Sequence, residues 1–91
     1  MQNTRKIHVF QTLKTMNVDF EVDPYGDIIA DYNRWEVVFP EEDSLVILVT
    51  FAKTMSAGSA ADIAIRFAWP LQNAGFIVTV NPGYFEPRAR V

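Results

Sequence analysis

Carboxylate side chains crowd one stretch of this 91-residue chain, between residues 19 and 43. The stretch holds nine acidic residues and a single base, Arg34. The acids are Asp19, Glu21, Asp23, Asp27, Asp31, Glu36, Glu41, Glu42 and Asp43. The stretch therefore carries a net charge of −8, while the remainder carries +5 and the whole chain −3. Such a separation of charge indicates what a protein binds rather than how it folds.

Clustered carboxylates can attract a basic macromolecule, hold a cation, or simply keep a surface solvated. A calcium site is not expected, because neither the acids nor the glycine match the twelve-residue EF-hand loop. Acids spread over an open sheet also diverge rather than enclose an ion. We expect no metal and no other cofactor, and the basic partner and the solvated surface both stay open.

Residues that could catalyse a reaction are few. The chain has no cysteine, which excludes disulfides, thiolate nucleophiles and cysteine-based metal sites. His8 is the only histidine, and its position on a predicted helix favours exposure to water. Ser59 follows a glycine, but the sequence AGSAA lacks the second flanking glycine of the G-x-S-x-G nucleophile motif, so Ser59 is expected to cap a helix. We therefore expect a protein that is not an enzyme.

Alternation of acidic and apolar residues predicts that strands position the first acids. In DPYG, residues 23–26, the Asp, Pro and Gly occupy positions that they prefer in a type I turn followed by a glycine bulge. This turn pairs residues 18–23 with residues 32–27 in antiparallel order, so that Glu21 lies opposite Ile29.

A second hairpin, with Asn33 and Arg34 as a two-residue loop, would pair residues 28–32 with residues 39–35 and set Ile29 opposite Val38. The two registers agree on which side chains share a face. One face carries no charge and consists of Val18, Phe20, Val22, Ile28, Ala30, Tyr32, Trp35, Val37 and Phe39. The other consists of Asp19, Glu21, Asp23, Asp27, Asp31 and Glu36, together with Ile29 and Val38.

Two helices and two further strands complete the predicted fold. Residues 3–16 form an amphipathic helix, with Asn17 in the left-handed position after it. Residues 45–53 are a continuous apolar run, typical of a strand inside a sheet. A last strand covers residues 76–80, before a turn at residues 81–83.

The helix that begins at Ser59 contains a proline. Pro70 has no amide to bond the carbonyl of Arg66, so we expect a kink, or two short helices divided at Trp69. Gly75 is expected to end this helix.

The predicted order is α-β-β-β-β-α-β, an α+β fold of two layers in which both helices pack on one face of a mainly antiparallel sheet. At this length, residues 1–91 make a single compact domain. Residues 86–91 form a predicted loose tail.

From these features we expect a small interaction module that presents an acidic sheet face to a basic macromolecular partner. One form of this function is a nucleic-acid mimic that inhibits a nucleic-acid-binding protein, because side chains two apart on a strand lie ~6.6 Å apart, similar to phosphates along a nucleic-acid strand. The predicted partner-binding residues are Asp19, Glu21, Asp23, Asp27, Ile29, Asp31, Glu36, Val38, Glu41, Glu42 and Asp43.

Two alternatives stay open. An apolar strip of Ile29, Val38 and the outward residues of 45–53, or an unpaired edge strand, would suit a structural protein that forms a homodimer or larger homo-oligomer. An RNA-binding module of α-β-β-β-α type would place Arg5, Lys6 and Lys14 on phosphates, although the pI of about 4.9 works against such contacts. No window has the ~18 apolar residues of a membrane span and no signal peptide is evident, so we expect a cytoplasmic location.

Overall fold

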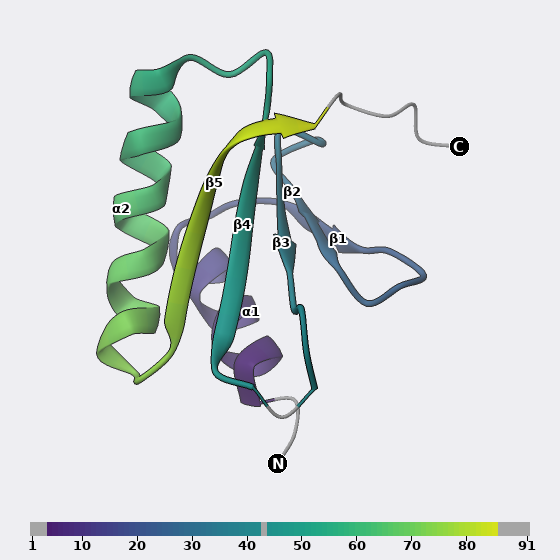
Figure 1. Cartoon of the computed structure of the whole chain (residues 1–91), viewed down its shortest axis with the longest axis vertical. Helices are drawn as coiled ribbons and strands as arrows, with labels where there is room; N and C mark the ends of the chain where they lie inside the picture. The colour runs from purple at the N-terminus through teal and green to yellow at the C-terminus, as the bar shows by residue number, and fades with distance from the viewer. Residues whose placement is uncertain (1–3, 43, 86–91) are drawn as a thin grey trace.

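The computed structural model of the chain describes residues 4–42 and 44–85, so Asp43 and the predicted tail at residues 86–91 lie outside the described part. The elements follow the predicted order α-β-β-β-β-α-β in an α+β fold (Figure 1). They are α1 (Thr4–Thr15), β1 (Phe20–Val22), β2 (Ile28–Ala30), β3 (Trp35–Val38), β4 (Val46–Ala52), α2 (Ala57–Asn73) and β5 (Ile77–Phe85).

The five strands form one sheet in the order β1-β2-β3-β4-β5. Neighbouring strands are antiparallel except β4 and β5, which run parallel because α2 carries the chain back between them (Figure 1). β4 lies inside the sheet, as its apolar run predicted. β5 extends through residues 81–83, which were predicted as a turn, and Pro82 is tolerated because β5 is an edge strand.

The first hairpin has the predicted register. Glu21 pairs with Ile29, and the flanking pairs of β1 and β2 follow in the predicted order. Gly26 has a φ of 88°, and its amide bonds the Asp23 carbonyl at 3.0 Å. This is the conformation for which the turn chemistry of Pro24 and Gly26 is suited.

The second hairpin differs from the prediction. Its loop has four residues, 31–34, and Ile29 pairs with Glu36 instead of Val38. Asp31, Tyr32 and Asn33 take φ values of 54°, 56° and 74°, and the Arg34 amide closes the loop on the Ala30 carbonyl at 3.1 Å. Asp and Asn adopt this left-handed region more readily than most residues, which makes the longer loop possible.

The change in register preserves the two faces of the hairpin, because a shift of two residues returns each side chain to the same side. Ile28, Trp35 and Val37 therefore still face the core. Tyr32, assigned to the uncharged face, instead lies in the loop and is 80% exposed. Val22 shares the face of its partner Ile28 but is 51% exposed, because β1 is an edge strand.

Both helices and one side of the sheet contribute to a single hydrophobic core. On β4, Ile47, Val49 and Phe51 are buried, whereas Val46, Leu48 and Thr50 between them are half-buried. Trp35 is fully buried and meets Phe67 of α2 edge to face, with 5.1 Å between the ring centroids. The helices also supply Val9, Leu13 and Leu71.

Both helices end as predicted. Asn17 after α1 and Gly75 after α2 have φ values of 64° and 99°. In each case the next amide reaches back into the helix, from Val18 to the Leu13 carbonyl and from Phe76 to the Leu71 carbonyl, both at 3.0 Å. These are Schellman motifs, which satisfy carbonyls that a helix end would otherwise leave without partners.

The start and the middle of α2 differ from the prediction. The N-cap is Ser56 rather than Ser59, because Ser56 is extended and its Oγ accepts a hydrogen bond from the Ser59 amide at 3.1 Å. Pro70 does not divide the helix, which is continuous over Ala57–Asn73. Pro70 lies in the last turn and there removes only one backbone hydrogen bond.

Candidate interaction surface

Side chains on the sheet face opposite Trp35 form a row across four strands. Cross-strand pairing aligns Glu21, Ile29, Glu36 and Thr50 from β1 to β4. Paired residues project to the same face, and strands are ~4.8 Å apart, so the two glutamates stand about 10 Å from each other on either side of Ile29. The predicted opposition of Asp31 and Glu36 is absent, because Asp31 lies in the loop.

The predicted apolar strip keeps its β3 and β4 residues on one face but loses Ile29 as an accessible member. Ile29 is only 3% exposed and so offers almost no surface to a partner. Val38 is half-buried and pairs with Leu48, on the same face as Val46, which pairs with Ile77. Ile77 is 56% exposed. The accessible apolar side chains of this face therefore lie over β3 to β5, away from most of the acids.

Three of the acids stabilise turns. Asp23 Oδ1 accepts hydrogen bonds from the amides of Tyr25 and Asp27, at 2.9 and 3.0 Å. Asp19 Oδ2 accepts a hydrogen bond of 2.6 Å from the hydroxyl of Tyr32. Asp31 forms an ion pair with Arg34 at 3.7 Å. Sequence patterning predicted the turn position of Asp23 but treated Asp19 and Asp31 only as surface charge.

The hydrogen bond to Asp19 also changes the acidity of Tyr32. It raises the pKa of Tyr32 above its ordinary value of 10.0, and the negative charge of Asp19 adds to the effect. Loss of the phenol proton would remove this hydrogen bond and set a second negative charge beside the carboxylate. Tyr32 and Asp19 therefore join the second loop to the start of β1 through a proton that Tyr32 retains.

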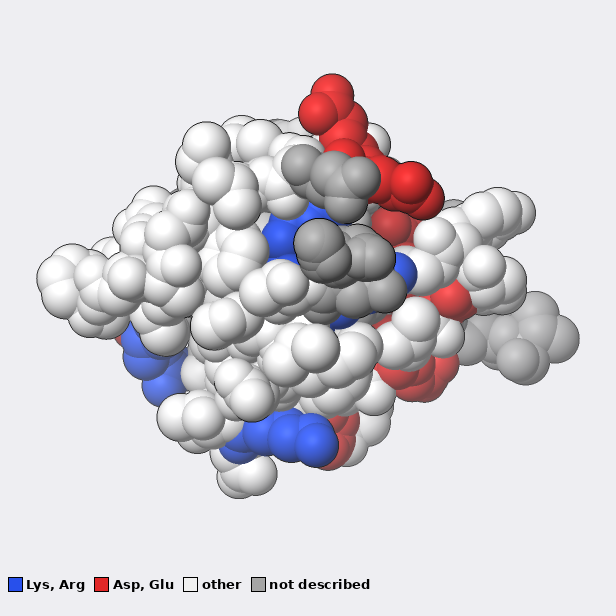
Figure 2. All heavy atoms as spheres, turned by 90° about the horizontal axis from the view of Figure 1, so that it is seen from below, with Lys and Arg blue, Asp and Glu red and all other residues white. Residues whose placement is uncertain are grey.

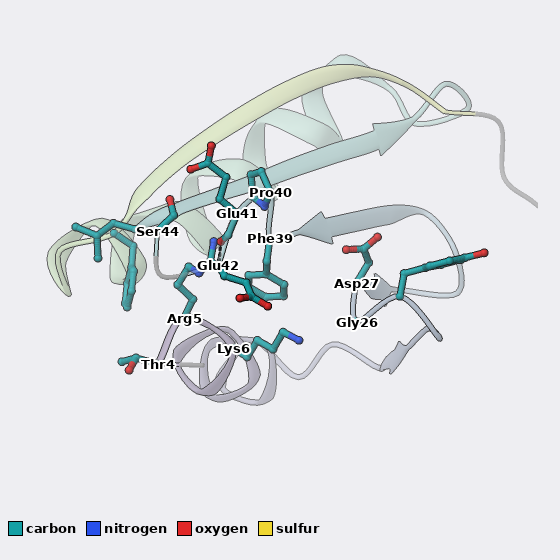
Figure 3. A pocket seen from close by; sticks show the side chains of 13 residues that line it. Thr4, Arg5, Lys6, Gly26, Asp27, Phe39, Pro40, Glu41, Glu42 and Ser44 are labelled. Carbon is teal, nitrogen blue, oxygen red and sulfur yellow. Dashed lines mark hydrogen bonds between the residues drawn. The ribbon is translucent and has the colours of Figure 1, made fainter. Parts of the chain in front are cut away.

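A groove of about 1080 Å³ lies where the start of α1, the β1–β2 turn and the β3–β4 loop meet (Figure 3). Arg5 and Lys6 extend from α1 over the ring of Phe39, at 5.4 and 5.5 Å from its centroid. Arg5 also donates hydrogen bonds to the carbonyl of Val46, at 2.8 Å, and to that of Glu41. Both cations are thus held against the protein, partly by cation–π attraction.

Acids occupy the rim of this groove. Asp27, Glu41 and Glu42 line it together with the two cations, and Glu41 and Glu42 are exposed. Figure 2 shows the acidic side chains gathered towards one side of the molecule. Arg5 and Lys6 are the residues that an RNA-binding module would need on phosphates, and here Phe39 and backbone carbonyls engage them. No sequence pattern predicted this groove, since Phe39 was assigned only to the uncharged face.

The other candidates for chemistry have structural contacts. The ring of His8, expected to face water, is half-buried and lies 5.1 Å from the ring of Phe76. The hydroxyl of Ser59 accepts a hydrogen bond from Ser56 at 3.0 Å. Within residues 4–42 and 44–85, no group of three or more His, Asp or Glu side chains is arranged to hold a metal ion. In the same part of the chain, neither helix is long and apolar enough to span a membrane.

No protein-family model, curated protein or solved structure matches the chain.

Proposed function

We propose that the protein is a small, non-enzymatic interaction module that binds a basic macromolecular partner through its acidic surface. We define this surface as Asp19, Glu21, Asp27, Glu36, Glu41 and Glu42, to which Asp43 belongs by sequence. The observation that carries the proposal is the row in which Glu21 and Glu36 flank Ile29 on the sheet face opposite the core. We also infer a two-layer architecture, with both helices on the Trp35 face, so that Glu21 and Glu36 lie on the face away from the helices.

The distribution of charge supports this function. Arg34 pairs with Asp31, and Arg5 and Lys6, which share a groove with Asp27, Glu41 and Glu42, lie over the ring of Phe39. Glu21 and Glu36 stand in the row on the other face of the sheet. A negative field of this kind accelerates the encounter with a basic partner and weakens over a Debye length of ~8 Å at physiological ionic strength. Binding should therefore be fast and sensitive to salt.

We infer a cytoplasmic nucleic-acid-binding protein as the partner class, with the acidic surface acting as a nucleic-acid mimic. Asp19 and Glu21 lie two positions apart at β1, so their Cα atoms are spaced by ~6.6 Å. That spacing is comparable with the spacing of phosphates on one strand. A mimic of this type would inhibit its partner by occupying the nucleic-acid site.

Capture from host-cell lysate tests the proposal. The protein, immobilised through its C-terminus, is compared with the Glu21→Lys/Glu36→Lys variant. The matched control adds the same four units of positive charge elsewhere, through Gln11→Lys, Thr15→Lys, Thr54→Lys and Asn73→Lys, all at exposed positions. We expect wild type and control to retain a basic protein that the reversal loses, and duplex DNA or RNA to displace it. Equal retention by the reversal variant, or retention that duplex cannot displace, would contradict the mimic.

A further inference from the structure

Helix α2 exposes two large apolar side chains one turn apart. Ile65 is 67% exposed and Trp69 is 66% exposed, and their spacing of four residues places them on one side of the helix. The 17-residue helix has only two charged residues, Asp62 and Arg66, which form an ion pair at 3.3 Å. Large aromatic and aliphatic side chains presented in this way are characteristic of interfaces.

Small residues continue the same side of α2 towards its N-terminus. Ala61 lies one turn before Ile65, and Gly58 lies a further turn back. A Cβ atom added at Gly58 would meet nothing within 4 Å, so the space above it is open. The side chains on this face are therefore small in the first half of α2 and large in the second half. Two such faces are complementary when the helices run antiparallel, because the large side chains of each helix then pack on the small residues of the other.

The charges of α2 fit the same arrangement. On a helical projection Asp62 and Arg66 lie together along one edge of the Ala61–Ile65–Trp69 stripe. With a two-fold axis at Ile65, this edge of one helix faces the same edge of the other. Asp62 of one copy and Arg66 of the second copy are then offset along the helix axis by only two residues, ~3 Å. Each Arg66 would then lie between its own Asp62 and that of the second copy.

We propose that the occupant of this face is a second copy of the chain, with the two α2 helices packed antiparallel about a two-fold axis near Ile65. Trp69 of each copy lies over Ala61 and Gly58 of the other, so the contacts are reciprocal, as a two-fold interface requires. The area buried by one helix pair is smaller than the ~1,200 Å² at which stable interfaces begin. The dimer is therefore weak and should form at protein concentrations of tens to hundreds of micromolar. The inference does not depend on the acidic surface.

Sedimentation equilibrium of the purified full chain, at about 10 μM to 1 mM, tests the dimer. We expect the weight-average mass to rise from that of one chain towards that of two. The Ala61→Glu variant places a carboxylate under the incoming Trp69 and should remain monomeric. The Ile7→Ser variant removes an apolar side chain on α1 that is 55% exposed, and it should dimerise like wild type. A monomer throughout the range, or a dimer unaffected by Ala61→Glu, would overturn the proposal.

Charge swaps test the antiparallel orientation. Asp62→Arg alone brings four arginines together along one edge and should weaken the dimer at least tenfold at low salt. The double variant Asp62→Arg/Arg66→Asp again places opposite charges next to each other along this edge, and it should recover most of the dimerisation affinity. Failure of the double variant to recover would contradict this register.

Fluorescence gives a readout from the interface itself. The chain has two tryptophans. Trp35 is fully buried, and its indole N–H has no hydrogen-bond partner among residues 4–42 and 44–85, so Phe is a suitable replacement. In the Trp35→Phe variant, Trp69 is the sole tryptophan, and its emission should shift to shorter wavelength as the concentration rises. Emission that stays at the wavelength of an exposed indole while the mass doubles would place the interface elsewhere and overturn the proposal.

Discussion

At the scale of single residues, the Tyr32–Asp19 hydrogen bond offers a direct test of local structure. The folded protein raises the pKa of Tyr32, chiefly through this hydrogen bond. Because the folded pKa lies above the unfolded value of about 10, the stability that the pair contributes is complete below pH 10 and is lost as the pH rises through the folded pKa.

Absorbance titration of tyrosinate, taken as the difference between wild type and Tyr32→Phe, isolates Tyr32. We expect its pKa to fall towards 10 in Asp19→Asn, where the acceptor loses its charge. Asp62→Asn, which removes a charge on α2, serves as the control and should leave the titration unchanged. A titration of Tyr32 that is the same in Asp19→Asn and wild type would mean that this hydrogen bond does not set the pKa.

Two glycines provide opposite predictions for the same substitution. Gly26 has a φ of 88°, and an added Cβ would lie 3.0 Å from Lys6 Nζ, so Gly26→Ala should lower the free energy of unfolding by about 1–2 kcal/mol, mainly through backbone strain. Gly58 lies in the first turn of α2 with open space around it, so Gly58→Ala should raise that free energy by up to about 1 kcal/mol. Urea unfolding at low micromolar concentration measures both. Equal effects of the two substitutions would argue against the turn.

At the level of secondary structure, two serines three residues apart, Ser56 and Ser59, are the candidates for the N-cap of α2. Ser56→Ala removes the acceptor for the Ser59 amide and should lower the free energy of unfolding by about 1 kcal/mol. Ser59→Ala keeps that amide bonded to Ser56 and should cost less than half as much. Chemical unfolding of the two variants decides between the caps, and a larger loss for Ser59→Ala would restore the sequence-based assignment.

The elements also indicate which features the sequence determines locally. The register of the first hairpin could be predicted because Pro24 fixes one backbone angle and Gly26 permits a positive one. The ends of both helices could be predicted for the same reason, from Asn17 and Gly75. The second loop could not, because no glycine marks it and Tyr32 rarely adopts the left-handed conformation. The loop between β2 and β3 takes four residues instead of two only because of the way the assembled sheet pairs its strands.

The side of the sheet on which each residue of the candidate surface lies could be predicted, whereas the burial of Ile29 and the groove could not. An error of two residues in register left Glu21 and Glu36 on the same side, because strand side chains alternate with a period of two. The burial of Ile29 and the groove around Phe39 depend on tertiary contacts between distant segments. Sequence periodicity carries no information about such contacts, so both were missed.

At the scale of the whole molecule, the fold separates two surfaces that differ in chemistry. The acidic surface lies on β1 to β3 and the β3–β4 loop, whereas the apolar stripe of Ile65 and Trp69 lies on α2. α2 packs beside β5, at the opposite edge of the sheet from β1 (Figure 1). A dimer formed through α2 would therefore present two acidic surfaces, and we expect a bivalent ligand to gain avidity from it.

Under the proposed function, the position of the acids, and not only the net charge, drives binding to the partner. The most direct measurement is the association rate constant of the captured partner with wild type, with Glu21→Lys/Glu36→Lys and with the four-lysine control, at several salt concentrations. We predict that the reversal lowers this rate constant at least tenfold at low salt, that the control lowers it much less, and that the difference shrinks as salt rises. Equal slowing by both variants, or a rate constant independent of salt, would contradict the claim.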